Sequence, residues 1–388
     1  MSLAASVVVA SMPLLGSVHL DGDLLGWEGL RGERNVVRVV ALHDGRPDGR
    51  QRELWSTRGS VELSDLDVAA SGEAVVCLRE RSGRDDQTWR VRIVRRSQQG
   101  VWSKPQLVAD PKRWVEFLTC GIGDAGQVAL SWVESTSRSR PVRAAFVAPD
   151  GAVEPPMTLA TDPVDDPETV LAPDGTATVA YTLEPDRERV LYVAQRQAVG
   201  GWASRPIAPA FGPHLASDGT GRPLLGWSGW GEGDEAQYFA AGPGFTPSAF
   251  VRESDSALGA LAGGPRGDVL AAWHTRASRG DGFLRVAVQR PGAAFSAPVT
   301  LGRFGAYPLL ATLDAAGGGA IATIGGTDRR PRPFARVLRP DGTWGARIKV
   351  TYEPAGLAPA GDGRFVLATA QPSRYGGYRV LRVRTIGG

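Results

Sequence analysis

The stretch Gly126-Gln127-Val128-Ala129-Leu130-Ser131-Trp132 joins a turn glycine to a short strand of small and apolar residues that ends on an aromatic ring. Its clear copies are Gly22-Asp23-Leu24-Leu25-Gly26-Trp27, Asp174-Gly175-Thr176-Ala177-Thr178-Val179-Ala180-Tyr181, Gly221-Arg222-Pro223-Leu224-Leu225-Gly226-Trp227 and Gly267-Asp268-Val269-Leu270-Ala271-Ala272-Trp273. Weaker copies start at Gly72, Gly317 and Gly363. Successive anchor glycines lie 46 to 54 residues apart, a near-constant period of the length that propeller blades have.

A second element recurs within each period, where an aromatic residue follows a turn and leads into small residues and often Pro. Its copies are Gly100-Val101-Trp102-Ser103-Lys104-Pro105, Gly201-Trp202-Ala203-Ser204-Arg205-Pro206 and Ala294-Phe295-Ser296-Ala297-Pro298, with variants at Leu54-Trp55-Ser56-Thr57 and Gly342-Thr343-Trp344-Gly345. Each period therefore supplies four strands, here called a to d, joined by short turns. The sequence predicts an all-β chain that forms one closed β-propeller domain over residues 1–388. We expect about eight four-stranded blades, with seven as the alternative if one weak anchor is a loop insertion.

The ends of the chain fit the same scheme. The last period provides strand a (356–360), strand b (365–369) and strand c (378–385), and it lacks a fourth strand. We expect the apolar N-terminal segment 5–12 to complete this blade, because closure of the ring removes exposed sheet edges.

Composition limits the classes of function. The 50 Gly and 28 Pro residues argue against long helices. A net charge of +3, from 44 basic and 41 acidic residues, is too balanced to indicate nucleic-acid binding. No stretch has the length of a membrane-spanning helix. The segment 4–15 is apolar but lacks the positive start of a signal peptide. We expect a monomer that works outside the cell or at its surface, with a cytoplasmic location as the alternative.

Two cysteines, Cys77 and Cys120, lie in apolar strand runs, where a free thiol behaves as a small hydrophobic side chain. Adjacent blades can bring them together, so the sequence leaves both a disulfide and two free thiols open.

The Asp-Gly turn, the small-residue strand ending in Trp, and the Gly-x-Trp-Ser-x-Pro element resemble the repeats of bacterial sialidase-like propeller proteins, many of them secreted by actinobacteria. The resemblance covers nearly the whole chain and implies the propeller architecture. That group includes glycosidases and lectins. Sialidases carry an Asp-box, Ser-x-Asp-x-Gly-x-x-Trp, whereas the nearest approach here, Pro340-Asp341-Gly342-Thr343-Trp344, lacks the Ser and is one residue short. A sialidase arginine triad, Tyr nucleophile and acid do not map onto positions of this chain.

Most of the eleven tryptophans belong to the repeat, and repeated positions indicate packing between blades. Two that do not are candidates for ligand contact. Trp114, which follows Arg113, lies between strands d and a, and Trp230 lies between strands b and c. These two kinds of loop emerge on the same face of a propeller, where an exposed aromatic ring suits stacking on a sugar or docking a partner. The alternative is a loop that folds back on itself.

Arginines also gather in the loops between strands b and c. The candidates for ligand contact are Arg84, Arg138, Arg187, Arg279 and Arg329. Several of these loops also carry acids, so a solvated rim of mixed charge is one interpretation. The other is an electropositive mouth that attracts a carboxylate, sulfate or phosphate, since guanidinium groups match these anions.

His19 and His214 fall in the innermost strands of blades 1 and 5, opposite each other across an eightfold ring, and both are candidates for ligand contact. No spacing typical of a zinc site is present, and we predict no metal or other cofactor. The acidic segment 162–168 offers oxygen ligands for calcium, but it lacks the spacing and the central Gly of an EF-hand loop.

No nucleophile elbow, P-loop or dinucleotide fingerprint appears. The first hypothesis is therefore a binding module for a carbohydrate or a protein partner, which uses the loops of one face around the central channel. The second is an enzyme that acts on a glycan or another anionic small molecule in the central pocket. The third is a structural component of a larger assembly.

Overall fold

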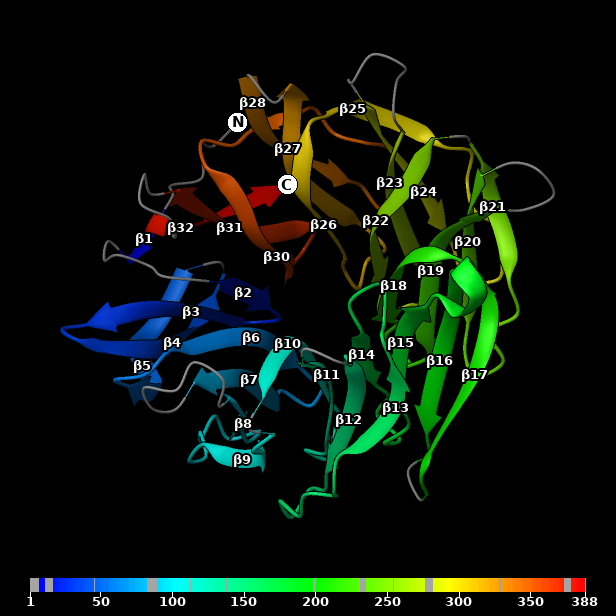
Figure 1. The fold of residues 1–388 in the computed structure, drawn as a ribbon. Coiled ribbons are helices and arrows are strands. Elements are labelled where there is room, and N and C mark those ends of the chain that lie inside the picture. The colour runs from blue at the N-terminus through cyan, green and yellow to red at the C-terminus, as the bar shows by residue number, and fades with distance from the viewer. Residues whose placement is uncertain are drawn as a thin grey trace.

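In the computed structural model, the chain forms eight four-stranded antiparallel sheets arranged in a ring (Figure 1). The structure describes residues 7–10, 17–44, 46–81, 89–111, 113–136, 139–197, 200–230, 235–253, 255–275, 282–327, 330–372 and 378–387. The innermost strand of each sheet contacts the innermost strands of both neighbouring sheets, which closes the ring. The predicted β-propeller is confirmed, with eight blades rather than seven.

The first four blades follow one another along the chain, each running outward from its innermost strand a to strand d. Blade 1 contains β2 (Val18–Asp21), β3 (Leu24–Arg31), β4 (Arg34–His43) and β5 (Arg46–Thr57). Blade 2 contains β6 (Val61–Val68), β7 (Ala74–Arg81), β8 (Trp89–Arg96) and β9 (Gln106–Ala109). Blade 3 contains β10 (Trp114–Ile122), β11 (Val128–Ser135), β12 (Pro141–Val147) and β13 (Met157–Thr161). Blade 4 contains β14 (Glu168–Leu171), β15 (Ala177–Leu183), β16 (Val190–Arg196) and β17 (Trp202–Pro209), with a 3₁₀ turn, η1 (Pro185–Arg187), between β15 and β16.

The next three blades repeat this order. Blade 5 contains β18 (Phe211–Ser217), β19 (Pro223–Trp230), β20 (Glu235–Ala241) and β21 (Ser248–Arg252). Blade 6 contains β22 (Ser256–Gly263), β23 (Val269–Thr275), β24 (Gly282–Gln289) and β25 (Val299–Phe304). Blade 7 contains β26 (Ala306–Leu313), β27 (Gly319–Thr327), β28 (Arg330–Leu338) and β29 (Ile348–Lys349).

Blade 8 combines both ends of the chain. Its strands are β30 (Glu353–Gly361), β31 (Arg364–Pro372), β32 (Tyr378–Gly387) and β1 (Val7–Ala10). In Figure 1 the blue β1 lies beside the red β32, and the two strands pair in antiparallel register. The N-terminal segment thus supplies the missing fourth strand, as predicted.

The anchor glycines form the turns between strands a and b. All eight of them, from Gly22 in blade 1 to Gly363 in blade 8, adopt a positive φ of 49° to 85°. Only glycine adopts this backbone conformation at low cost, which explains why the repeat is visible in the sequence.

The core lies between the faces of neighbouring blades. The repeat tryptophans of the b strands are fully buried, which confirms their predicted packing role: Trp27, Trp132, Trp227 and Trp273. They lie within these strands and not at their ends, because each strand continues for two to four residues beyond its tryptophan. Between blades 2 and 3, a disulfide joins Cys77 of β7 to Cys120 of β10 within the apolar core. The structure thus settles the pairing that the sequence left open.

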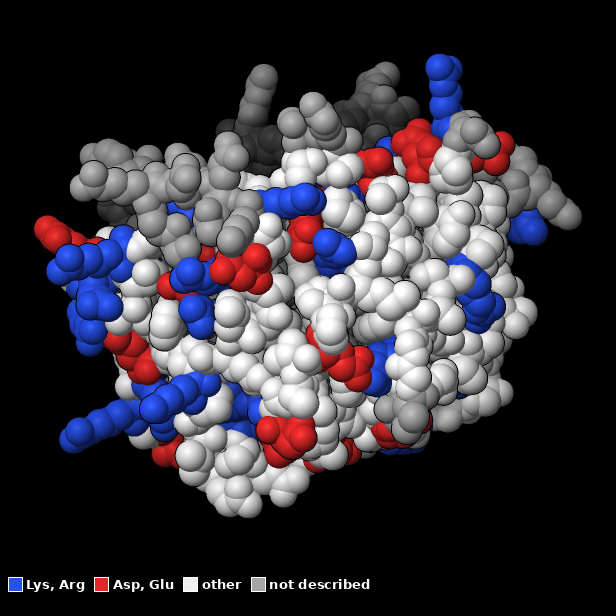
Figure 2. Space-filling view, turned by 60° about the horizontal axis from the view of Figure 1, so that its bottom comes forward, with Lys and Arg blue, Asp and Glu red and all other residues white. Residues whose placement is uncertain are grey.

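On the side of the molecule shown in Figure 2, the described surface carries charges of both signs. There, basic and acidic side chains are interspersed among uncharged ones. Among the described residues, no helix is long and apolar enough to span a lipid bilayer.

Candidate functional site in the central channel

The innermost strands line two adjoining cavities near the ring axis. The first, here the acidic cavity, has a volume of about 330 Å³, and its polar lining residues are His19, Asp21, Asp65, Asp67, Thr169 and Ser217. The second, here the histidine cavity, has a volume of about 380 Å³ and is lined by His19, Glu168, His214 and mainly apolar residues of blades 6 to 8. His19 lies in the wall of both, so the two cavities meet at β2.

Carboxylates of the acidic cavity also hold neighbouring blades together. The backbone N–H of Val68 in blade 2 donates to Asp21 Oδ2 of blade 1, with an N···O distance of 2.7 Å. Blade 3 repeats this arrangement, because the N–H groups of Cys120 and Ile122 donate to Asp65 Oδ2 and Asp67 Oδ2 at 2.9 and 2.7 Å. The backbone of the next blade thereby fixes each side chain in the cavity wall.

Burial makes these carboxyl groups weak acids. It raises the pKa of Asp65 to about 7, against the stabilising hydrogen bonds from the N–H groups of Cys120 and Leu66. Burial raises the pKa of both Asp21 and Asp67 above the usual range of an aspartate, and the negative charge of a neighbouring aspartate acts in the same direction on each.

The pKa values of the two histidines shift in opposite directions. Burial lowers the pKa of His19 to about 4, so its imidazole is neutral at neutral pH; its Nδ1 lies 3.9 Å from Asp65 Oδ1. Burial also acts to lower the pKa of His214. Glu168 acts in the opposite direction through its negative charge and a hydrogen bond, with Glu168 Oε1 3.3 Å from His214 Nδ1, and the net effect is a raised pKa. His214 thus forms an ion pair as the pH falls.

Neither cavity has an Arg or Lys among its described lining residues. An anionic ligand would therefore meet carboxylates and little positive charge. The central pocket favours an uncharged or cationic ligand over the anionic small molecule that one of the sequence-based hypotheses placed there.

Trp114 is exposed, as predicted, at the start of β10. Its side chain is 42% exposed, and its ring packs edge to face against the buried Trp89, with 5.0 Å between ring centroids. Arg113, immediately before it, is also exposed. Ligand contact by these two residues stays a prediction.

Several predicted ligand residues lie outside the part of the chain that the structure describes. They are Arg84, Arg138, Arg279, Arg329 and the side chain of Trp230. Arg187 is described as an exposed residue at the end of η1, with a φ of 69°. The electropositive mouth therefore stays a prediction.

The acidic segment 162–168 bonds to neighbouring backbone. The N–H of Arg140 donates to Asp162 Oδ1 at 2.9 Å, and the N–H of Gly212 in blade 5 donates to Asp165 Oδ2 at 3.2 Å. Glu168 accepts a hydrogen bond from the N–H of Leu215. Within the described ranges, no group of three His, Cys, Asp or Glu side chains is placed to hold a metal ion.

The sequence-based interpretation missed the three aspartates of the acidic cavity. Asp65 and Asp67 occupy alternate positions of an innermost strand, and Asp21 ends the equivalent strand of blade 1. Side chains at alternate positions share a face of a strand, so this spacing was the available signal.

Comparisons with known proteins identify the fold. No family model matches the chain, and no curated protein matches it. Sqt1 from Chaetomium thermophilum, solved bound to the N-terminus of the ribosomal protein L10, is 13% identical with a TM-score of 0.52, over 99% of this chain and 100% of that one. The β-propeller domain of the trilobed protease from Pyrococcus furiosus is 12% identical with a TM-score of 0.50, over 89% and 97%. The polysaccharide lyase Uly1 is 10% identical with a TM-score of 0.44, over 97% and 91%.

The similar solved structures include β-propellers. At identities this low the likeness shows the fold alone. The finer resemblance to sialidase-like repeats has no family match and stays a prediction.

Proposed function

We propose that the chain is a ligand-binding β-propeller whose ligand is a carbohydrate, and that the acidic cavity of the central channel is its site. The observation that carries this proposal is the polar cavity itself, about 330 Å³ in volume and walled by side chains from several blades. Ligand sites are typically concave, with volumes of roughly 300–1,000 Å³ and a few convergent polar groups.

The protonation of the wall favours a hydroxylated ligand. Carboxyl groups with raised pKa values, such as Asp65, both donate and accept hydrogen bonds near neutral pH. The neutral His19 and the hydroxyls of Thr169 and Ser217 do the same. Sugar hydroxyls match such a mixed set of donors and acceptors. Trp114, exposed at the start of β10, does not line this cavity and stays a separate candidate for stacking on a sugar.

A protein partner is the other occupant that the sequence indicated. The similar propeller Sqt1 was solved bound to the N-terminus of another protein, which supports a peptide as an alternative ligand. An extracellular or cell-surface setting and a monomeric state are further parts of the proposal.

One observation favours an enzyme as the second candidate. Asp21 and Asp67 both line the cavity, and burial raises the pKa of each. Neighbouring carboxyl groups with raised pKa values are of the kind that general acid–base catalysis uses.

A glycan array followed by calorimetry tests the proposal. The variants are Asp65→Asn and Asp67→Asn, and the matched control is Asp362→Asn, in an exposed turn of blade 8. We expect one class of glycan to bind the wild type and the control equally, and both cavity variants at least tenfold more weakly. Binding that all three variants retain would exclude this cavity as the site. Consumption of the glycan that stops in Asp67→Asn would establish the enzyme instead.

A further inference from the structure

A cavity away from the ring axis lies between blades 5 and 6. It has a volume of about 720 Å³ and is lined by the turns between strands a and b and between strands c and d of both blades. None of its lining residues lines the acidic or the histidine cavity. Its basic lining residues are Arg222, Arg266 and Arg290.

A buried carboxylate positions Arg222. The side chain of Asp218 is only 2% exposed, and its Oδ2 accepts a hydrogen bond from Arg222 Nε at 3.0 Å. Its Oδ1 is held by the N–H and hydroxyl of Thr220 and by the N–H of Arg222. The two terminal nitrogens of Arg222 hydrogen-bond to no other residue that the structure describes, so this edge of the guanidinium is free to receive a ligand.

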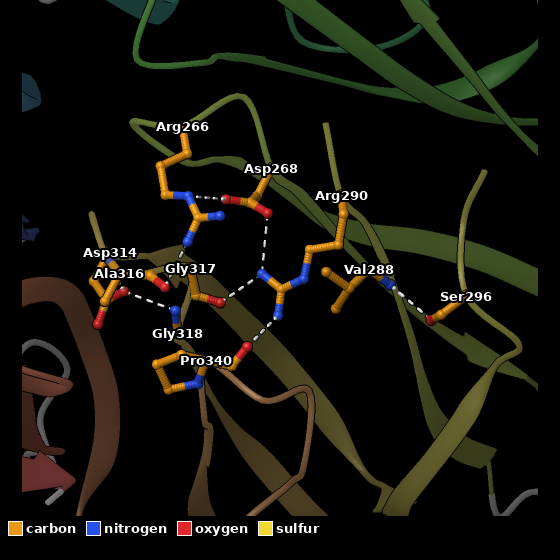
Figure 3. Close-up of polar contacts among 10 residues, drawn as sticks. All are labelled: Arg266, Asp268, Val288, Arg290, Ser296, Asp314, Ala316, Gly317, Gly318 and Pro340. Atoms are coloured by element: carbon orange, nitrogen blue, oxygen red, sulfur yellow. Dashed lines mark hydrogen bonds and ion pairs between the residues drawn. The ribbon is translucent and has the colours of Figure 1, made fainter. Parts of the chain in front are cut away.

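A second buried carboxylate, Asp268, positions Arg266 and Arg290 (Figure 3). Its side chain is fully buried, with Arg290 Nη1 at 3.0 Å from Oδ1 and Arg266 Nε at 3.9 Å from Oδ2. Arg290 also donates to the carbonyls of Gly317 and Pro340 in blade 7, which fixes its position. Arg266 donates from Nη1 to the Ala316 carbonyl at 3.0 Å, while its side chain remains 55% exposed.

The repeat itself does not require Arg222 and Arg266, which lie in the turns between strands a and b. In the equivalent turns of blades 1 to 4 the charged residues are all acidic: Asp23, Glu73, Asp124 and Asp174. Those turns keep the same glycine geometry. Arg222 and Arg266 therefore add something other than the turn, and what they add is positive charge around the cavity.

We propose that this cavity is a second binding site, for a small hydroxylated molecule that carries one oxyanion group. Guanidinium groups pair with carboxylate, sulfate or phosphate through two parallel hydrogen bonds. Thr246, Ser248 and Gln289 line the same cavity and supply polar groups for hydroxyls. The cavity has the volume of a site for such a molecule, within the range of roughly 300–1,000 Å³.

The test uses glucuronate, glucose 6-sulfate and glucose 6-phosphate as probes, with glucose and inorganic sulfate and phosphate beside them, by calorimetry on the full chain. We expect the charged sugars to bind in a salt-dependent manner, glucose not to bind, and the inorganic anions to bind more weakly. The rank of the three charged sugars identifies the oxyanion.

Two variants locate the site. Arg222→Lys keeps the charge beside Asp218 but loses the forked geometry, and Arg266→Gln removes one charge. We expect each to weaken binding on the order of tenfold. The matched control, Arg339→Gln, changes an exposed arginine in a turn of blade 7 that does not line the cavity. Thermal unfolding of each variant verifies that it is folded.

Three results would overturn the inference: no charged sugar binds, glucose binds as well as its charged forms, or both arginine variants bind like the wild type. If the inorganic anions bind as tightly as the charged sugars, the cavity recognises the oxyanion alone and the hydroxyl groups contribute nothing. Asp67 lines the acidic cavity and not the cavity between blades 5 and 6. Asp67→Asn therefore tests only the channel site, and the arginine variants test only this one, so the failure of either proposal can be recognised separately.

Discussion

Arginine side chains link neighbouring blades on the face that carries the turns between strands a and b and between strands c and d. Arg95, at the end of strand c in blade 2, donates from Nη1 to the carbonyls of Gly126, Ala148 and Pro149 in blade 3, with N···O distances of 3.1 to 3.2 Å. Arg290 of blade 6 bonds in the same way to the turns of blade 7. The abundance of arginine over lysine thus has a structural use, because a planar fork reaches several carbonyls at once.

Replacing Arg95 with Lys tests this role. The ammonium group keeps the charge, but the lysine side chain is one bond shorter, so its nitrogen ends short of the three carbonyls that Nη1 contacts. We therefore expect the free energy of unfolding to fall by about 1 kcal/mol. Denaturant unfolding measures the change. Arg52→Lys, at an exposed position of β5, is the control and should stay within about 0.5 kcal/mol of the wild type. Equal stability of the two variants would contradict the structural role.

Two buried carboxyl groups, Asp65 in the acidic cavity and Glu28 of β3, predict an unusual pH dependence. Burial raises the pKa of Asp65 and of Glu28 to about 7, well above the values of about 4 that carboxyl groups have in an unfolded chain. Between these values the folded chain keeps protons that the unfolded chain has lost. The stability these groups contribute is therefore complete at low pH and is lost as the pH rises through about 7. The lowered pKa of His19 acts in the opposite sense but is a single group.

We therefore expect the free energy of unfolding to decrease from pH 5 to pH 8, by about 1 kcal/mol or more. The cavity admits solvent, so the change is smaller than the full pKa shifts imply. Urea unfolding across this range measures it. Asp65→Asn should give a shallower profile and Asp362→Asn a profile parallel to the wild type. A wild type that gains stability up to pH 8 would show that these groups ionise freely.

At the scale of strands and turns, the anchor glycines do more than permit a positive φ. At Gly72 (φ 83°) an added Cβ would meet nothing within 4 Å, whereas at Gly221 (φ 77°) it would lie 1.8 Å from Cδ of Pro173 in the turn of blade 4. The turns of neighbouring blades thus touch at some positions and not at others.

This difference predicts two distinct costs. Gly72→Ala should destabilise the protein by about 1 kcal/mol, from backbone strain alone. Gly221→Ala adds a steric clash with Pro173 of the preceding blade and should cost roughly 2–4 kcal/mol. Thermal and denaturant unfolding of both variants make the comparison. Equal losses would mean that the turn of blade 5 moves away from Pro173 without cost.

The same elements show what the sequence could predict. The period of the anchor glycines predicted the blades, and the apolar segment 5–12 contained β1, because both depend on local backbone geometry. The acidic cavity depends on contacts between blades, such as the one between Asp65 and Cys120, which lie 55 residues apart. A register irregularity between Leu63 and Asp65 in β6 also interrupts the simple alternation of faces. The pattern alone therefore did not show which acids face the channel or that Cys77 meets Cys120.

At the scale of the whole molecule, the ring depends on one short strand. The described part of β1 is four residues long and is the outermost strand of blade 8, where it pairs with β32 and joins the two ends of the chain. The disulfide between Cys77 and Cys120 links only blades 2 and 3. Closure of the ring therefore relies on β1 and on the packing of β2 against β30.

Deleting residues 1–10 tests the importance of this closure. Loss of β1 exposes the edge of β32, and an exposed edge pairs with other chains. We expect the midpoint of thermal unfolding to fall by roughly 5 °C or more, and light scattering to show association at high protein concentration. A variant that lacks only residues 1–6 keeps β1 and is the control. If both deletions behave like the wild type, contacts between the innermost strands of blades 1 and 8 are sufficient to close the ring, and β1 serves only to cover an edge.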